Sequence, residues 1–391
     1  MQATDKAPTQ WMLIRGIRQL LTLSGPGGPR RGTAAGILNV IPDAAILLRN
    51  GVVDRVGKAR GVENTREARN AQELDARGAV ILPGFVEPDA VIAPPGPQMP
   101  RKQRELAAAR AAMELGRYGY SAAGAHTADA EDLREVVKIL RAHQNAQLRP
   151  LRIRPIVSLP FMEAGRDNSA LLETVERRWL PSVQKRRLAV IAEVTVHDGG
   201  AAAGTEDTRK LVEVAAGLGF AVRFRSIAPM DAEQARFAAA AGAIAVVAPL
   251  DFGCPLTALQ GSGVHVVPCA GLLSLAPRDY GHASRNHGVA LALSSGYNAV
   301  DAASVNPQLL LYLACSRLGM TSEEAITAMT WNAACSLRMS NVAGSLDVGR
   351  PADLVALDVG HYADMVRRAG NNDVTFVMRG GRIVYARGVV S

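Results

Sequence analysis

The chain has 391 residues, which is too long for a single small hydrophobic core. We therefore expect two structural units or one large barrel with an appendage. Hydrophobic residues make up 48% of the sequence and charged residues 20%, a balance that excludes an intrinsically disordered protein. The formal net charge of +8 would attract an anionic partner, but the basic residues are scattered and no nucleic-acid-binding motif stands out. We therefore expect no nucleic-acid partner.

Both ends of the chain show the pattern of a β-hairpin. Residues 44–57 and 374–388 each contain two apolar runs, which are joined by Asn50-Gly51 in the first case and by Gly380-Gly381 in the second. These dipeptides supply the positive φ angles of a tight turn. The pattern predicts small β units at both termini that combine into one domain.

Between these ends, short apolar runs alternate with helical segments. Eight strands are expected, around residues 80–86, 120–125, 151–158, 188–196, 219–225, 243–248, 264–268 and 289–294. Eight β/α steps of this length predict a parallel barrel. The predicted fold class is therefore α/β, with a distorted (β/α)8 TIM-type barrel over 81–344 and a composite β-sandwich domain from 1–80 and 345–391.

The cysteine spacing and the hydropathy of the sequence indicate the cellular compartment of the protein. The four cysteines show no CxxC spacing, which is typical of buried thiols in a reducing environment. No apolar run reaches the ~18 residues that span a bilayer, and the first residues lack the layout of a signal peptide. We therefore predict a cytoplasmic protein without a membrane span.

In a barrel of this kind the chemistry takes place at the carboxyl ends of the strands. The polar residues expected there are few: Asp89, His126, His197, Asp198, Arg225 and Cys269. None of the seven histidines is spaced as HxH, HxxxH or HxxE, the spacings typical of metal ligands. The favoured interpretation of these polar residues is hydrogen-bonded loop ends.

Three chemical alternatives remain at this rim. A metal site would draw on Asp89, His126, His197 and Asp198. Cys269 would act as a nucleophile, although a buried structural thiol is the stronger interpretation. Arg225 would bind a carboxylate substrate, or would pair with Asp89 or Asp198 and fill the mouth of the barrel, which is the favoured outcome.

Several stretches together resemble the imidazolonepropionases of the metal-dependent amidohydrolase superfamily. They are "IRGIRQLLTLSGPGGPRRG", "ILPGFVEP", "ERRWLPSVQKRRLAVIAEV" and "VNPQLLLYLACSRLGMTSEEAITAMTWNAACSL", the last followed by "GSLDVGRPADLVALD". The resemblance covers nearly the whole chain. It implies a distorted (β/α)8 barrel, a composite β domain, a homodimer, and a zinc or iron ion in the active site.

The resemblance fails at the positions that carry the family's chemistry. The His-x-His after strand one falls at Asp89 and Val91, and the remaining family positions fall at His197, Arg225, Ala248 and Gly296. A substrate-contacting histidine after strand three falls near Phe161. The pattern therefore predicts no catalytic residue of the family type, no metal and no cofactor; residues for ligand binding would be His126, Phe161, His197 and Arg225.

Three functions follow as hypotheses, with a nonenzymatic role favoured. The first is a noncatalytic structural, regulatory or complex subunit with a protein partner. The second is a divergent hydrolase of cyclic C–N bonds with a rebuilt, metal-independent or relocated-metal site. The third is a small-anion binding protein anchored by Arg225.

Overall fold

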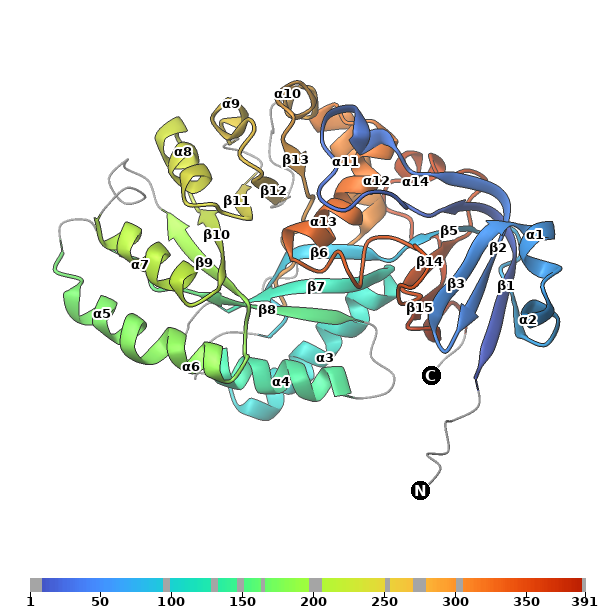
Figure 1. Ribbon diagram of the computed structural model, residues 1–391, viewed down its shortest axis with the longest axis horizontal. Helices are drawn as coiled ribbons and strands as arrows, with labels where there is room; N and C mark the ends of the chain where they lie inside the picture. The colour runs from blue at the N-terminus through green and yellow to red at the C-terminus, as the bar shows by residue number, and fades with distance from the viewer. Residues whose placement is uncertain are drawn as a thin grey trace, which may run out of the picture.

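In the computed structural model, the described residues are 9–93, 99–127, 133–145, 151–162, 166–196, 206–249, 254–269, 279–299 and 305–388. They form two sheets, one parallel and one mixed, with helices packed around them (Figure 1). No helix within these ranges is long and apolar enough to cross a membrane.

The parallel sheet contains eight strands in sequence order, β6 to β13. They are β6 (Phe85–Ala90), β7 (Tyr120–His126), β8 (Arg152–Ser158), β9 (Ile191–Val196), β10 (Ala221–Ser226), β11 (Ala245–Pro249), β12 (His265–Cys269) and β13 (Ala290–Leu291). The sheet curls, and its two ends approach each other where Val91 forms a parallel bridge with Asn298. The predicted parallel strands are confirmed, whereas full closure into a (β/α)8 barrel stays a prediction.

Helices follow most of these strands on the outer side of the curl (Figure 1). They are α3 (Arg101–Arg117), α4 (Leu133–Asn145), α5 (Ser169–Thr174), the π-helical turn Val175–Trp179, α6 (Leu180–Lys185), α7 (Glu206–Gly217), α8 (Ala232–Ala240), α9 (Leu256–Leu259) and α10 (Tyr280–His287). Parallel strands need such crossovers, because consecutive strands must return to the same end of the sheet.

Three helices follow β13 before the chain returns to the mixed sheet. They are α11 (Pro307–Leu318), α12 (Ser322–Met329) and α13 (Trp331–Ser336). Thr321 and Glu324 form a capping box at the start of α12. α13 and the residues after it pack small and apolar side chains against the inner face of the parallel sheet, among them Ala333, Ala334 and Leu337. One end of the sheet's interior is thus filled by hydrophobic packing.

The mixed sheet takes strands from both ends of the chain. Its order is β16-β15-β14-β5-β1-β2-β3, with β4 also pairing with β1. The strands are β1 (Trp11–Leu21), β2 (Val40–Arg49), β3 (Val52–Lys58), β4 (Gln72–Asp75), β5 (Val80–Pro83), β14 (Leu354–Leu357), β15 (Val374–Arg379) and β16 (Arg382–Ala386). Short helices accompany it: η1 (Gly32–Gly36), α1 (Ala59–Glu63), α2 (Arg66–Arg69) and α14 (Asp364–Arg367).

This arrangement corrects the predicted sandwich. The described strands form one continuous sheet, because β14 pairs antiparallel with β5 and so extends the sheet begun by the N-terminal strands. Both predicted hairpins are present, and their turns touch. Gly51 has a φ of 79°, and a Cβ on it would overlap the carbonyl oxygen of Gly380, so only glycine fits there.

The strand predicted over 80–86 is in fact two strands in different sheets. The break is at Gly84, whose N–H donates to the carbonyl oxygen of Asp353 at 3.1 Å. A Cβ at Gly84 would overlap the side chain of Ser121. The close approach lets the chain pass from β5 of the mixed sheet directly into β6 of the parallel sheet.

Candidate functional site

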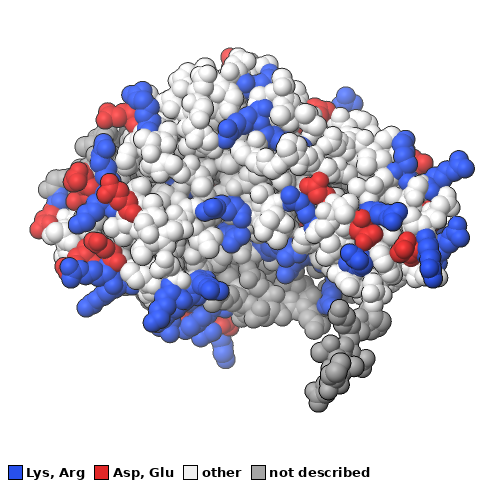
Figure 2. Space-filling view, viewed as in Figure 1, with Lys and Arg blue, Asp and Glu red and all other residues white. Residues whose placement is uncertain are grey.

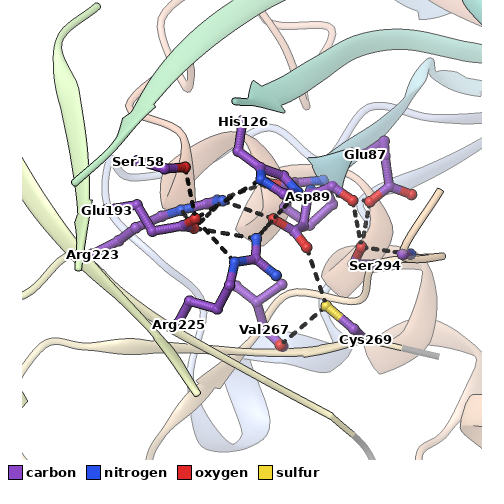
Figure 3. Close-up of polar contacts among 12 residues, drawn as sticks. Glu87, Asp89, His126, Ser158, Glu193, Arg223, Arg225, Val267, Cys269 and Ser294 are labelled. Carbon is purple, nitrogen blue, oxygen red and sulfur yellow. Dashed lines mark hydrogen bonds and ion pairs between the residues drawn. The ribbon is translucent and has the colours of Figure 1, made fainter. Parts of the chain in front are cut away.

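Four charged side chains meet inside the curl of the parallel sheet, at the carboxyl half of the strands (Figure 3). They are Asp89 of β6, Glu193 of β9, and Arg223 and Arg225 of β10. Side chains two residues apart on a strand share a face, so Arg223 and Arg225 both point inward. We call these four residues the ion cluster.

Arg223 is the buried centre of the ion cluster, with a side chain only 1% exposed. Its Nε donates to Glu193 Oε2 at 2.6 Å, and its terminal nitrogens donate to Asp89 Oδ1 at 2.7 Å and to the carbonyl oxygen of Pro88 at 3.0 Å. A buried guanidinium is costly unless its donors are satisfied. Here three acceptors from two strands satisfy it.

Arg225 lies one layer further toward the carboxyl ends of the strands. Its Nε donates to Glu193 Oε1 at 2.9 Å, and a terminal nitrogen donates to Asp89 Oδ1 and, at 3.2 Å, to Glu193 Oε2. Of the two roles expected for Arg225, the structure shows the pairing with Asp89. The ion cluster holds two positive and two negative charges and is neutral as a whole.

The two carboxylates stay ionised despite complete burial. Burial alone would raise the pKa of Asp89, but the positive charges of Arg225 and Arg223 hold that pKa well below its usual range. Burial also acts to raise the pKa of Glu193, but the positive charges of Arg223 and Arg225 outweigh it and lower that pKa to about 2. Neither carboxylate therefore serves as a proton donor near neutral pH.

His126 caps the ion cluster from β7. Its Nε2 lies 3.9 Å from Asp89 Oδ1 and its Nδ1 lies 3.9 Å from Glu193 Oε1, and 15% of its side chain is exposed. Burial, followed by the charge of Arg225, lowers the pKa of His126 below its usual value. The imidazole is therefore neutral at pH 7 and adds no charge to the cluster.

Cys269 reaches the ion cluster from β12, with Sγ 3.5 Å from Asp89 Oδ2. Burial, followed by the negative charge of Asp89, raises the pKa of this thiol well above its usual range. The thiolate is the nucleophilic form of cysteine, and it is disfavoured here. The structure thus supports the interpretation of Cys269 as a structural thiol and not as a nucleophile.

A separate buried carboxyl group, Glu87, links β6 to the segment after β13. It accepts hydrogen bonds from Ser294 Oγ, from Ser295 N at 2.9 Å, from Ser295 Oγ at 2.6 Å and from Asp89 N at 3.1 Å. Burial raises the pKa of Glu87 to about 7, although these donors favour the charged form. Glu87 thus ties the first strand of the parallel sheet to the end of the last.

Other residues expected at the site lie elsewhere. Val91 bridges to Asn298 in the backbone, and Ala248 packs in the hydrophobic core on the outer face of the sheet. Gly296 adopts a φ of 66° and donates its N–H to Ser294 Oγ at 2.9 Å. Phe161 is 37% exposed. His197 and Asp198 lie outside the described residues.

Sequence reasoning missed Glu193, Arg223 and Glu87. Each is a charged residue within an otherwise apolar strand, in "IAEVTV", "AVRFRS" and "FVEPDA". A charge in a buried strand requires a partner, and this signal was available in the sequence.

The described residues of the ion cluster do not fit a divalent metal ion. Asp89 and Glu193 already accept several guanidinium hydrogen bonds, and Arg225 places positive charge between them. Among the residues that the structure describes, no group of three or more His, Cys, Asp and Glu side chains is arranged to hold a metal. A zinc or iron site needs three or more such ligands that converge on one point.

Comparison with known proteins finds a family match to part of the chain and relatives that resemble nearly all of it. The pattern of the Amidohydrolase family matches residues 283–384. The imidazolonepropionase of Brevibacillus brevis is 28% identical over 97% of this chain and 99% of its own length. That of Symbiobacterium thermophilum is 27% identical over 97% of this chain and 98% of its own length.

Solved structures agree on the fold. The N-isopropylammelide isopropylaminohydrolase of Burkholderia multivorans superimposes with a TM-score of 0.70 at 17% identity, covering 98% of this chain and all of that one. The ochratoxinase of A. niger gives a TM-score of 0.69 at 17% identity, covering 98% of both chains. The chain is therefore similar over nearly its whole length to imidazolonepropionases, and residues 283–384 match the Amidohydrolase family.

Proposed function

We propose that this protein is a noncatalytic member of its superfamily, a structural or regulatory subunit that acts through a protein partner. The observation that carries the proposal is the ion cluster. Metal-assisted hydrolysis needs a bound cation that lowers the pKa of a water molecule from 15.7 to about 7. Here Arg223 and Arg225 satisfy the carboxylates that would otherwise attract such a cation.

The remaining side chains do not replace that nucleophile. Cys269 is held as the neutral thiol, and Asp89 and Glu193 are bound in ion pairs. The cluster is internally neutral, which also argues against the small-anion binding protein, since Arg225 offers its charge to Asp89 and Glu193.

One observation favours a metal-independent hydrolase as a second candidate. The His126 imidazole is neutral and partly exposed, and two carboxylates lie 3.9 Å from its ring nitrogens. A neutral histidine oriented by carboxylates is a competent general base. This candidate would require a water molecule activated by His126 alone.

The test combines metal analysis with an activity assay. The purified protein is incubated with zinc or iron, freed of excess metal, and analysed for metal content and for hydrolysis of imidazolonepropionate. The Brevibacillus brevis relative, treated identically, is the positive control. We expect far less than one metal ion per chain and no turnover. One tightly bound metal ion per chain together with turnover would overturn the proposal, and turnover without metal that His126→Ala abolishes would establish the second candidate.

A further inference from the structure

The end of the parallel sheet opposite the ion cluster carries a group of arginines. They are Arg152 and Arg154 of β8, Arg338 just after α13, and Arg379 of β15, and we call them the basic patch. Arg152 and Arg154 share the face of β8 that Ile156 presents to the interior, with Arg154 one layer and Arg152 two layers nearer the start of the strand. The basic patch therefore spans the junction of the two sheets.

Backbone contacts hold these side chains in place. A terminal nitrogen of Arg154 donates to the carbonyl oxygen of Arg338 at 3.2 Å, and one of Arg379 donates to the carbonyl oxygen of Leu151 at 3.2 Å. Neither contact brings a negative charge. These two contacts fix the positions of Arg154 and Arg379 without adding a carboxylate to either.

One carboxylate faces the basic patch within the described part of the chain. Asp353 is buried and pairs with Arg152, which donates from Nε and, at 3.1 Å, from a terminal nitrogen. Asp353 also accepts the N–H of Gly380 at 2.7 Å, so its oxygens are occupied. Arg154 and Arg338 form no ion pair with a carboxylate among the described residues.

Electrostatic strain remains at the basic patch. The pKa of Arg154 is lowered by burial and then by the charge of Arg338, and that of Arg379 by burial and then by Arg152. The Nε of Arg154 is buried without a hydrogen-bond partner. Closely packed like charges of this kind are relieved when an anion is shared between them.

The surface view agrees with an excess of positive charge in this region. Basic side chains lie across the middle of the visible face, where Figure 1 places β8, whereas acidic side chains gather mostly toward the sides (Figure 2). The chain as a whole carries a net charge of +8. Such a field attracts an acidic partner and orients it toward the positive region.

We propose that the basic patch docks an acidic segment of a protein partner. The inference rests on the proposed function for the existence of a partner and adds its chemistry. Arginine suits this role because its planar guanidinium binds carboxylates through two parallel hydrogen bonds. The patch extends along a strand and across to a second sheet, so it matches an extended row of carboxylates better than a single small anion.

Binding of a fluorescent oligoglutamate peptide to the full-length protein, measured by anisotropy, tests the proposal. The variant Arg154→Gln/Arg338→Gln removes two charges from the patch. The control Arg66→Gln/Arg69→Gln removes the same charge from exposed positions on α2. We expect about tenfold weaker binding for the patch variant and little change for the control. Equal weakening in both variants would overturn the proposal, because binding would then follow net charge alone.

Further measurements separate the alternatives. Arg338→Glu alters an exposed side chain and keeps the test valid if the double variant fails to fold. Displacement of the peptide by stoichiometric inorganic phosphate, or tighter patch-dependent binding of a DNA oligonucleotide, would replace the acidic-segment proposal. The metal and hydrolysis assays test the noncatalytic role separately, so either proposal can fail while the other stands.

Discussion

Replacement of Arg223 by methionine tests whether the ion cluster is a stable, self-neutralised unit. Methionine keeps most of the length and apolar volume of arginine but removes its charge and donors. Asp89 and Glu193 would then share Arg225 as their one strong counter-charge and carry a net buried charge of −1. Removal of one partner from a buried ion pair costs about 3–5 kcal/mol, and we expect Arg223→Met to lower the free energy of unfolding by this amount.

Two further variants define the comparison. Arg15→Met breaks the Arg15–Glu73 pair, whose atoms lie 2.7 Å apart but whose side chains are about half exposed, so the expected loss is at most about 1 kcal/mol. Glu193→Gln added to Arg223→Met restores charge balance and should recover about 1–3 kcal/mol. Urea denaturation followed by far-ultraviolet circular dichroism measures all three variants and the parent protein.

The reasoning fails if Arg223→Met and Arg15→Met destabilise the protein equally. It also fails if the second substitution, Glu193→Gln, destabilises the Arg223→Met variant further instead of rescuing it. The first result would mean that solvent screens the ion cluster despite its burial. The second would mean that shape and hydrogen bonding at Glu193, and not charge balance, determine stability.

Three other outcomes follow from the geometry. The pKa of Glu87 rises from 4.5 to about 7 on folding, so the folded form retains a proton and its free energy of unfolding falls as the pH rises between these values. Glu87→Gln lacks this titration, so its free energy of unfolding should increase by up to about 3 kcal/mol relative to that of the parent between about pH 4.5 and 8. Urea denaturation at a series of pH values measures this difference. Thr321→Ala removes the capping box and should cost about 1 kcal/mol by thermal melting, whereas full retention of stability would contradict this role. Gly51→Ala should cost more than 1 kcal/mol in urea denaturation, with Gly61→Ala as the unstrained control, and equal stability of the two would refute the packing of the hairpin turns.

Much of the architecture was accessible from local sequence. The turn dipeptides Asn50-Gly51 and Gly380-Gly381 predict both terminal hairpins, because only a few residue types adopt the required positive φ angles. The alternation of apolar runs and helices predicts the parallel strands, since the period of hydrophobicity reports secondary structure. Less of the site can be predicted from the sequence. The sequence predicts that Arg225 pairs with Asp89 or Asp198, but it does not identify Glu193 and Arg223 as members of the ion cluster.

The sequence by itself determined the order of strands and helices, the likeness to imidazolonepropionases, and the departure from histidine at Asp89 and Val91. Tertiary structure alone decided that β14 continues the N-terminal sheet and that Asp89 lies against Arg223, 134 residues away along the chain. The physical reason is that local propensity and periodicity act over a few residues. The pairing of buried charges depends on which strands the curled sheet brings face to face, and no local sequence pattern encodes which distant strands these are.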